Sequence, residues 1–487
     1  MYELTIPLNE EGKPLYEQIY EYIKTQIRER NLPAGIRLPS SRMLAAHLGV
    51  SRSTTQLAYD QLLSEGYLES EPRRGYYVAQ LDVLFHFKAE QKTEMKKKQK
   101  ENRSWVCDFS PRGVDLDSFP YGIWKKLSNN ILNEDNRILF SAGENKGDYA
   151  LRQAICTYLY GARGVNCRPE QLIVGAGNEY LLMLLNQILG DSSVIAMETP
   201  TYTQAYRVFE RLGHRIVPVE MDAAGMETEK LSESGADIAY VMPSHQFPTG
   251  IVMPIRRRME LLSWAAKKEG RYLIEDDYDS EFRYRGKPIP SLQSADRGGQ
   301  VIYLGSFSRA VAPAIRVSYM MLPERLLDVY EKTCSFYAST VSRVDQRILT
   351  EFITGGYYER HLNKMRSIYK AKHDALLAAL EPLEGAFSVS GEYAGIHILL
   401  KSREELSEEE MVARAAEKGV RVYGLSEFDI RTRKEEKEAG TVLLGYASLG
   451  KEEIQKGAAL LCAAYCQVRS TVQEDRACAE AEASSAV

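Results

Sequence analysis

Residues 303–319, YLGSFSRAVAPAIRVSY, gather hydroxyl and guanidinium groups directly after a short apolar run. Ser306 and Ser308 lie two residues apart, and Arg309 and Arg316 follow within the same segment. Hydroxyls, backbone N–H groups and guanidinium groups all donate readily to phosphate oxygens, and a loop after a buried strand can present them together. The segment therefore predicts a phosphate site at the end of a strand.

Acidic side chains end a second apolar run, YLIEDDYDSEFRY at 272–284. A carboxylate at such a strand end can keep the nitrogen of a pyridine ring protonated, which makes that ring an electron sink, and Asp276 is the best candidate. Since alternate residues of a strand share a face, Tyr278 would lie beside Asp276 and could bind a ring hydroxyl, while Asp277 would point away. A structural alternative is that these carboxylates only cap the next segment.

Two segments earlier in the chain could complete such a site. In LIVGAGNEYLLMLL a strand, a glycine loop and an apolar helix follow one another, so Gly177, Asn178 and Glu179 would direct N–H groups of a helix N-terminus at an anion. Tyr202, in PTY after another strand, offers an aromatic face to a flat ring. Taken alone, the glycine motif is a weak signal, and Tyr202 is equally compatible with a core position.

The first 79 residues predict a separate, compact helical unit. Leu15, Ile19, Ile23 and Ile27 form an apolar stripe, which indicates an inward-packing helix that stops at Asn31. The following sequence, from LPSSRMLA to DQLLSEGYL, has the pattern of two short helices, each opened by a serine cap and separated by a tight glycine turn. The serines are Ser40 or Ser41 and then Ser51, and the glycine is Gly49.

A basic surface accompanies these helices. YLESEPRRGYYVA alternates around a turn at 72–75, which predicts a β-hairpin with Arg73 and Arg74 at its tip. Between Arg30 and Tyr59 the sequence has four arginines and no Asp or Glu, so this region is positive although the whole chain carries a net charge of -5. A helix-turn-helix with a basic wing suits a DNA backbone. A protein-binding winged helix with solvated arginines is the alternative.

Composition limits the classes of protein that fit. With 62 Lys and Arg against 67 Asp and Glu, bulk charge does not favour nucleic acid, so DNA binding must come from that local surface. The seven cysteines lack metal-ligand spacing, since even the nearest pair, Cys462 and Cys466, has no histidine nearby, and we expect reduced thiols. No apolar run reaches the about 18 residues of a membrane span, and the first residues lack a secretion signal, so we expect a cytoplasmic protein with no membrane contact.

Short apolar runs alternate with helical periods from Trp105 onward, and each run precedes a Gly, Pro or acidic cluster. This pattern predicts an α/β fold with a mostly parallel sheet, whose site lies in the loops at the carboxyl ends of the strands. The lysine-rich stretch before it has too little apolar content to form a core and predicts a linker. We therefore expect a winged helix at 1–79, a linker at 80–104, a long α/β region, and a disordered tail at 467–487.

The motifs PLYEQI, LPAGIRLPSSRMLA, GVSRSTT and RRGYYV occur in one fixed order near the start of the chain. Through them this region resembles the GntR-type winged helix, which implies that the helix after Ser51 enters the major groove of a DNA operator. The resemblance, together with the basic wing, assigns DNA contacts to Arg42, Ser51, Arg52, Ser53, Thr54, Gln56, Arg73 and Gly75.

The later motifs GAGNEY, PTY, PSHQFPTG, EDDYDSEFRY and GSFSRAVAPAIR stand in the order of a fold type I aminotransferase. With the winged helix before them, the chain resembles the MocR type of GntR regulator. The resemblance implies a mostly parallel large domain at 105–370, a smaller α+β domain at 371–466, bound pyridoxal 5'-phosphate, a domain-swapped homodimer, and control by an amine or by the cofactor itself. The residues assigned to the cofactor are Gly177, Asn178, Glu179, Tyr202, His245, Asp276, Tyr278, Ser306, Ser308, Arg309 and Arg316.

Two positions depart from the aminotransferase pattern within this resemblance. Arg309 stands where those enzymes have the lysine that bonds covalently to the cofactor. A guanidinium group is always protonated in proteins, so it can neither add to an aldehyde nor accept the substrate proton. Phe247 replaces the asparagine of the NPTG turn, and His245 or Gln246 could supply the polar contact instead.

A third departure concerns the substrate. Leu443 and Leu444 lie where aminotransferases often place a carboxylate-binding arginine. We therefore predict a DNA-binding transcriptional regulator whose aminotransferase-like domain senses an amine or a pyridoxal phosphate-related effector, with at most a noncovalent cofactor and no catalytic residue. The alternative is a working aminotransferase with a fused DNA-binding domain, which would need another lysine, such as Lys287 on its Gly-Lys-Pro turn. A third interpretation is that position 309 was altered from lysine in this chain while the rest of the pocket stayed intact.

Overall fold

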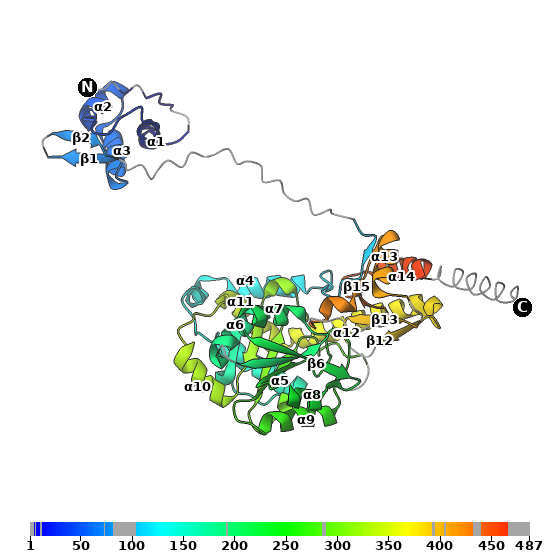
Figure 1. The fold of residues 1–487 in the computed structure, drawn as a ribbon. Coiled ribbons are helices and arrows are strands. Elements are labelled where there is room, and N and C mark those ends of the chain that lie inside the picture. Colours follow the sequence, from blue (N-terminus) through cyan, green and yellow to red (C-terminus); the bar gives the residue numbers. More distant parts are fainter. Residues whose placement is uncertain are drawn as a thin grey trace, which may run out of the picture. The chain divides into compact units, whose positions relative to one another are not determined.

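The computed structural model describes residues 4, 6–9, 12–72, 74–80, 104–190, 193–284, 289–391, 395–403, 406–431 and 440–465. They form two compact units, which divide between Asn102 and Arg103 (Figure 1). Each unit has its own buried apolar core. Nearly all of the predicted linker at 80–104 and the whole predicted tail at 467–487 lie outside the described residues.

In its described residues, the first unit consists of three helices and a β-hairpin. Ile19, Ile23 and Ile27 are buried on one face of the first helix, because a four-residue spacing returns to the same side. This helix ends before the predicted stop at Asn31, since Arg30 adopts a left-handed conformation with φ 64° that breaks the helical path. The elements are α1 Leu15–Arg28, α2 Ser41–Leu48, α3 Arg52–Ser64, β1 Leu68–Glu71 and β2 Gly75–Val78.

Serine side chains start the second and third helices of this unit. The Oγ atoms of Ser40 and Ser51 each accept a hydrogen bond from a backbone N–H in the first turn of the helix that follows, at 3.2 and 3.1 Å. Ser40 is therefore the cap of α2, and Ser41 is buried in its first turn. Gly49 ends α2 at φ 67°, a left-handed conformation that glycine adopts without strain.

We expect Ser51→Ala to destabilise α3 by about 1 kcal/mol, because the change leaves an N–H of its first turn without the side-chain acceptor. Hydrogen exchange of the α3 amides, measured by mass spectrometry on the full chain, should become faster. Ser64→Ala is the matched control, since Ser64 lies at the other end of α3 and bonds only to the carbonyl of Gln61 in the contacts described. Equal exchange in the wild type and the Ser51 variant would contradict the prediction.

The hairpin of the first unit has the predicted turn. β1 and β2 pair antiparallel, with Glu71 opposite Gly75. At the turn Arg74 forms an ion pair with Glu71 at 3.1 Å, and Arg73 lies outside the described residues. Gly75 has φ 113°, a backbone conformation that other residues rarely adopt, so the turn favours glycine.

The second unit is built around a sheet that has eight strands in the described residues, in the order β4-β11-β10-β9-β8-β5-β6-β7. The pairs from β10 through β9, β8 and β5 to β6 are parallel, while β11 is antiparallel to both of its neighbours. This confirms the predicted α/β class with a mostly parallel sheet. The elements up to the last strand of this sheet are β3 Cys107–Asp108, α4 Tyr121–Ile131, η2 Glu134–Phe140, α5 Tyr149–Arg163, η3 Pro169–Gln171, β4 Leu172–Gly175, α6 Asn178–Leu189, β5 Val194–Thr199, α7 Thr203–Arg211, β6 Arg215–Asp222, β7 Gly225–Met226, α8 Thr228–Glu233, β8 Ile238–Val241, α9 Ile255–Ala266, β9 Tyr272–Asp277, η4 Gln293–Ala295, β10 Val301–Ser306, η5 Pro313–Ile315 and β11 Ser318–Met321.

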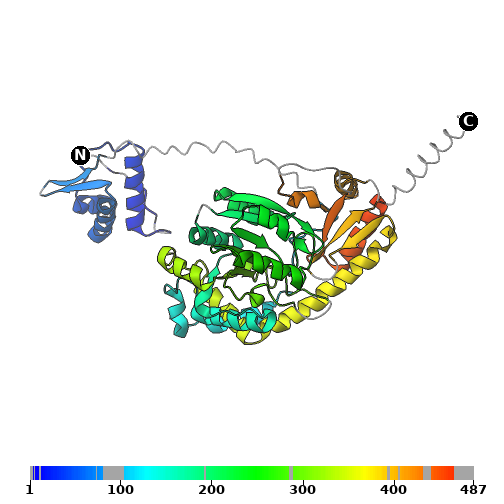
Figure 2. The ribbon, with the colours of Figure 1, turned by 60° about the horizontal axis from the view of Figure 1, so that its bottom comes forward.

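Helices cover both faces of this sheet (Figure 2). The strand β10 shows how, because its side chains alternate. Ile302 and Leu304 pack with α6, α7 and α10, whereas Val301 packs with α8 and α9 and Tyr303 with α4, α5 and α11. Burial on both faces explains why these strands read as continuous apolar runs in the sequence. The two later helices are α10 Glu324–Thr333 and α11 Arg343–Thr354.

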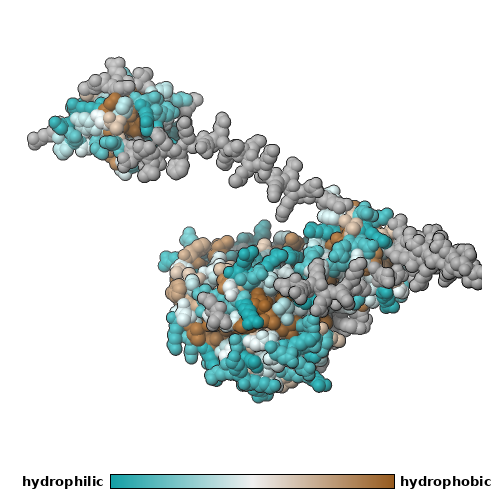
Figure 3. Space-filling model, in the orientation of Figure 1, coloured by the Kyte–Doolittle hydropathy of each residue, from teal (hydrophilic) through white to brown (hydrophobic). Residues whose placement is uncertain are grey.

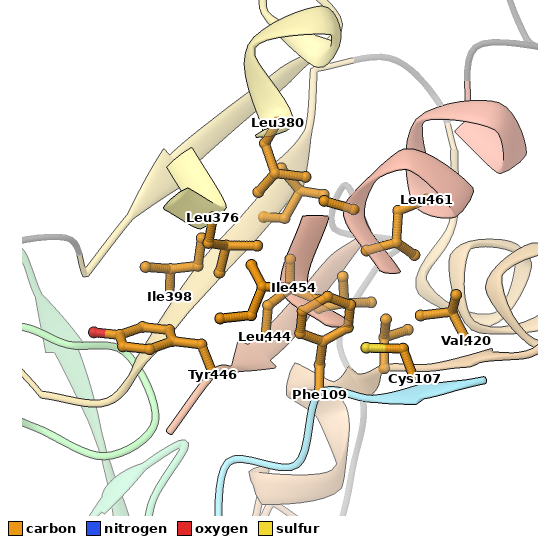
Figure 4. Close-up of a cluster of buried hydrophobic side chains, with 14 of the residues drawn as sticks. Cys107, Phe109, Leu376, Leu380, Ile398, Val420, Leu444, Tyr446, Ile454 and Leu461 are labelled. Atoms are coloured by element: carbon orange, nitrogen blue, oxygen red, sulfur yellow. The ribbon is translucent and has the colours of Figure 1, made fainter. Parts of the chain in front are cut away.

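A smaller antiparallel sheet, β12-β13-β16-β15, follows in the chain. Figure 4 shows its core, where Leu376 and Leu380 of α12 meet Ile398, Leu444 and other apolar side chains. The helix α12 also contributes to the core of the large sheet and crosses the predicted boundary at 370/371, so the domain limits stay predictions. The elements are α12 Tyr357–Leu380, η6 Glu381–Leu383, β12 Phe387–Ser390, β13 His397–Ser402, α13 Glu408–Glu417, β14 Val420–Arg421, β15 Tyr423–Gly424, η7 Leu425–Phe428, β16 Thr441–Gly445 and α14 Lys451–Tyr465.

The face that Figure 3 shows carries polar side chains over much of its coloured area, with apolar areas between them. The most exposed large apolar side chains of the described residues include Ile138, Phe140, Tyr160 and Phe336. In this part of the chain no helix is long and apolar enough to cross a membrane. The described residues also contain no group of three or more His, Cys, Asp or Glu side chains arranged to hold a metal ion.

Candidate functional site

A pocket of about 110 Å³ lies at the carboxyl ends of the parallel strands. Its walls come from the last residues of β9 and β10 and from the loops at the ends of β4, β5, β8, β9 and β10, where an α/β sheet of this kind gathers its site. Nine of the eleven predicted cofactor residues are among those that line it, which leaves out Gly177 and His245. The lining residues are Asn178, Glu179, Tyr202, Met242, Phe247, Asp276, Tyr278, Ser306, Ser308, Arg309 and Arg316.

Asp276 supplies the buried carboxylate of the pocket and is only 3% exposed. Its Oδ2 accepts hydrogen bonds from the hydroxyl of Tyr240 and, at 3.3 Å, from the amide of Asn178. Among the described residues, neither Oδ1 of Asp276 nor Oδ1 of Asn178 has a hydrogen-bond partner. Burial raises the pKa of Asp276 to about 6, against the opposing effect of the Tyr240 hydrogen bond. Two buried acceptors therefore face the pocket without a donor among the described residues.

Asp277, the next residue, faces the other side of the strand, as the alternation predicts. Its Oδ2 lies 2.8 Å from Nε of Arg163, which belongs to α5, and also accepts the hydroxyl proton of Tyr303. The side chains of Asp277 and Arg163 are 1% and 5% exposed. This buried ion pair fixes the end of β9 to α5 and so holds Asp276 toward the pocket.

The amino end of α6 and Arg316 form another corner of the pocket. Gly177 precedes the helix at φ 97°, and a Cβ there would run into the guanidinium group of Arg316. Nη2 of Arg316 lies 2.8 Å from Oε2 of Glu179, and the two side chains are 53% and 44% exposed. Burial raises the pKa of Glu179, whereas the hydrogen bond from Arg316 lowers it. The net effect keeps the pKa of Glu179 below its usual value. An anion that enters this corner must compete with Glu179 for Arg316.

The loop between β10 and β11 presents the predicted phosphate donors. Oγ of Ser306 accepts hydrogen bonds from the backbone N–H of Ser308 at 3.1 Å and from the hydroxyl of Ser318 at 3.0 Å. The guanidinium group of Arg309 lines the pocket, and its Nη1 donates to the carbonyl of Pro111 at 2.9 Å. The serines are thus fixed in place, and Arg309 is tied to the segment between β3 and α4.

Aromatic rings form the apolar wall. Phe247, which stands at the asparagine position of the NPTG-like turn, is 4% exposed. Its ring packs edge-on against Tyr202 at 6.1 Å and against Tyr278 at 5.9 Å between centroids. A flat ligand between Asp276 and the loop after β10 would therefore meet aromatic faces and edges.

His245 lies behind Tyr278 and does not belong to the pocket lining. Its Nδ1 contacts the carboxylate of Asp279 at 2.9 Å and the hydroxyl of Tyr278 at 2.9 Å. Any effect of His245 on a ligand would therefore pass through Tyr278. Gln246, the other residue considered in place of the missing asparagine, donates instead to the carbonyl of Pro200 at 2.9 Å.

Three neighbours of the site were not predicted. Tyr240 binds Asp276, Met242 lines the pocket, and Pro111 accepts from Arg309 across 198 residues of sequence. Tyr240 is marked in the sequence by a hydroxyl inside the otherwise apolar run IAYVM, whereas no pattern in the sequence points to Pro111. The roles of all the pocket residues toward a ligand stay predictions.

The first unit presents the other candidate surface. Arg42, near the start of α2, and Arg52, at the start of α3, are exposed, as are Ser51 and Ser53. Thr54, Gln56 and Gly75 are half-buried, and the amide of Gln56 donates to the hydroxyl of Tyr76 in the hairpin at 3.2 Å. The amino ends of two helices and the β-hairpin thus lie in one small unit, and their contacts with DNA stay predictions.

Together, these features define a class of protein in which a winged helix-turn-helix is joined to an aminotransferase-like α/β unit. Residues 15–78 match the family of bacterial regulatory proteins called gntR, and residues 120–458 match aminotransferase class I and II. The chain is 38% identical over 454 residues to the HTH-type transcriptional regulator YdeL of Bacillus subtilis. This alignment covers 93% of this chain and 97% of YdeL.

A second relative is MocR, the protein after which the MocR type of regulator is named. The chain is 30% identical over 473 residues to the probable rhizopine catabolism regulatory protein MocR of Rhizobium meliloti, with 94% of this chain and 95% of that protein covered. The chain therefore belongs to the MocR-type GntR family, whose members are HTH-type transcriptional regulators with an aminotransferase class I and II domain. That domain belongs to a pyridoxal phosphate-binding family.

Solved aminotransferases share the fold of the second unit. The multiple substrate aminotransferase from Thermococcus profundus superposes with a TM-score of 0.67 at 24% identity, over 76% of this chain and 93% of that one. LysN, the α-aminoadipate aminotransferase from Thermus thermophilus, superposes with a TM-score of 0.66 at 25% identity. The superposition covers 76% of this chain and 94% of LysN. The predicted fold type I architecture is confirmed.

Proposed function

We propose that the second unit binds a phosphorylated pyridine, such as pyridoxal phosphate or its amine form, without a covalent bond, and that this binding regulates DNA binding by the first unit. The observation that carries the proposal is the pair of buried oxygens on Asp276 and Asn178 that lack a donor within the described residues. A protonated ring nitrogen would supply that donor. The described lining of the same pocket contains two arginines and no lysine, which favours noncovalent capture of an anion.

The residues present fit such a ligand at both ends. Ser306, Ser308 and Arg316 can donate to a phosphate, provided that Glu179 releases Arg316. Tyr202 lines the same pocket and can stack on a ring. When bound, pyridoxal phosphate supplies a pyridinium electron sink and an aldehyde that reacts with amines. The residues of this chain would bind and orient it.

We infer that Arg309 occupies the position of the aminotransferase lysine, since it follows Ser308 in the loop after β10 and lines the same pocket. Its guanidinium group stays protonated, so it can attract an anionic ligand but cannot form a bond to the aldehyde. In the structure this group donates to Pro111. A ligand anion that draws Arg309 away would release the segment that precedes α4.

That segment gives a route for regulation. Pro111 follows β3, and β3 follows the predicted linker along the chain. We propose that the amine or vitamer effector changes this attachment within a domain-swapped homodimer, and so changes the spacing at which two winged helices meet a DNA operator.

Titration of the full chain with pyridoxal phosphate and with its amine form tests the proposal. We expect saturable thermal stabilisation by both, with no mass retained on the protein after borohydride reduction and denaturation. Binding to a DNA fragment selected from a random pool by the full chain should change in the presence of the ligand. An unfolding temperature and a DNA affinity that do not respond to either compound would contradict the proposal.

We expect Asp276→Asn to stabilise the ligand-free protein by about 3 kcal/mol at pH 8, because a buried carboxylate with a raised pKa is costly once ionised. The sign follows from proton binding: between about pH 4 and pH 6 the folded state holds a proton that the unfolded state has lost, so stability falls as the pH rises through this window. The Asp276→Asn variant has no carboxyl group to ionise at this position, so it lacks this fall in stability. The substitution also removes the charge that would hold a protonated ring nitrogen, so added pyridoxal phosphate should no longer stabilise the protein.

Thermal unfolding at pH 4 and pH 8, with and without pyridoxal phosphate, measures both effects of the change at Asp276. Asp277→Asn is an informative control, because Asp277 pairs with Arg163 on the other side of the strand and its loss should destabilise the protein at both pH values. An Asp276 variant that is less stable at pH 8 yet still stabilised by the ligand would count against the assigned role.

The rival function, a working aminotransferase with a fused DNA-binding domain, needs a lysine amine in the pocket. Lys287, the lysine considered for this role, lies outside the described residues. No observation on the described lining favours catalysis, so the regulator remains the function that the geometry supports best.

A further inference from the structure

We propose that Cys156 and Cys167 are a peroxide-oxidisable pair, a modification site that closes reversibly into a disulfide. Their Sγ atoms lie 3.3 Å apart, and both are free cysteines in the structure. The pair is separate from the ligand pocket, whose lining includes neither residue. This inference therefore stands apart from the proposed binding of a phosphorylated pyridine.

The two thiols differ in exposure in a way that suits such a site. Cys156 lies in α5 and is 5% exposed, inside the apolar core beneath the large sheet. Cys167 is partly exposed, in the segment between α5 and η3, and its neighbours Asn166 and Arg168 are both exposed. A small oxidant can thus reach Cys167 first. The buried Cys156 would then act as the resolving thiol that reacts with oxidised Cys167.

The backbone on both sides of Cys167 is held by side chains. The N–H of Asn166 donates to Gln293 at 3.0 Å, and the N–H of Arg168 donates to Gln171 at 3.1 Å. This fixes the thiol opposite α5. A disulfide needs the sulfur atoms about 2.0 Å apart, so a shift of roughly 1 Å through side-chain rotation would close the bond.

The chemistry needs a peroxide and no other reagent. The sulfur of Cys167 attacks one peroxide oxygen, an S–O bond forms, the O–O bond breaks, and the leaving oxygen departs as water with the thiol proton. The sulfur of Cys156 then attacks that of Cys167, an S–S bond forms, the S–O bond breaks, and a second water leaves with the second thiol proton. Two thiols are oxidised by two electrons in all, and one hydrogen peroxide is reduced to two waters.

Peptide mapping of the full chain tests the pair directly. The protein is treated with hydrogen peroxide, remaining thiols are alkylated, and the denatured chain is digested with trypsin, which cuts after Arg163 and so separates Cys156 from Cys167. We expect one linked peptide pair, lighter by two hydrogens than the sum of the free peptides and cleaved by dithiothreitol. The remaining cysteines of the chain report on general oxidation in the same sample.

Three variants complete the test. Cys167→Ser and Cys156→Ala should each abolish the linked pair, and using both guards against a folding defect in one. Cys462→Ser, at another partly buried cysteine, should leave it intact. The proposal is overturned if wild-type Cys156 and Cys167 are both alkylated after peroxide, if Cys167 appears only as irreversible acids, or if it is linked to a different cysteine.

Discussion

Replacing Arg309 with lysine should give the protein a covalent bond to pyridoxal phosphate, a bond that we expect to be absent from the wild-type chain. The expected change is from no retained cofactor to one per chain. The reason is that the other donors of the pocket, Ser306, Ser308 and Arg316, and the buried carboxylate of Asp276 are all in place around position 309. Lysine supplies the neutral amine that a guanidinium group cannot, because a cationic neighbour such as Arg316 lowers the pKa of an ammonium group.

Intact-mass spectrometry after borohydride reduction measures this change, and a peptide map locates it at position 309. Arg309→Gln is the matched control, since it removes the charge and the contact to Pro111 without adding an amine. Retained cofactor on a lysine of the wild-type protein, for instance Lys287, would falsify the noncovalent proposal and revive the aminotransferase alternative. A lysine variant that binds the cofactor but never bonds to it would show that Arg309 does not occupy the lysine position.

Local features of the fold could be predicted from the sequence because local interactions produce them. Ser51 and Gly49 act through hydrogen bonds and backbone angles within one turn of their helices, so their identity alone indicates where α3 starts and α2 ends. The end of α1 was placed too late for a related reason. Arg30 adopts a left-handed conformation that its residue type does not favour, so its identity does not indicate that the helix ends before it.

The candidate site could be predicted in outline because the sheet order brings strand ends together. Once GAGNEY, EDDYDSEFRY and GSFSRAVAPAIR are assigned to parallel strands and their loops, Asn178, Asp276 and Ser308 must meet at one edge. The partners of these residues could not be predicted in the same way. The contact of Arg309 with Pro111 depends on how a loop outside the sheet packs, which no periodicity encodes.

Alanine at Arg42 and Arg52 should have the second large effect, a loss of DNA binding. The two guanidinium groups are exposed near the amino ends of α2 and α3, where the predicted recognition surface lies. Removing one phosphate contact weakens binding by roughly tenfold and lowers the slope of affinity against salt by about 1, and the double variant should show both losses combined. Fluorescence anisotropy of the selected DNA fragment over a series of salt concentrations measures both quantities.

The salt slope separates the DNA-binding surface from its alternative, a winged helix that binds protein. Arg28→Ala is the matched control, since Arg28 is also an exposed arginine but lies at the end of α1, outside the two helices. If Arg42 and Arg52 contact phosphates, their loss lowers the slope while Arg28→Ala leaves it unchanged, and stabilisation by pyridoxal phosphate persists in all variants. If all three variants bind DNA alike, the arginines are solvated, and the positive region between Arg30 and Tyr59 serves another partner.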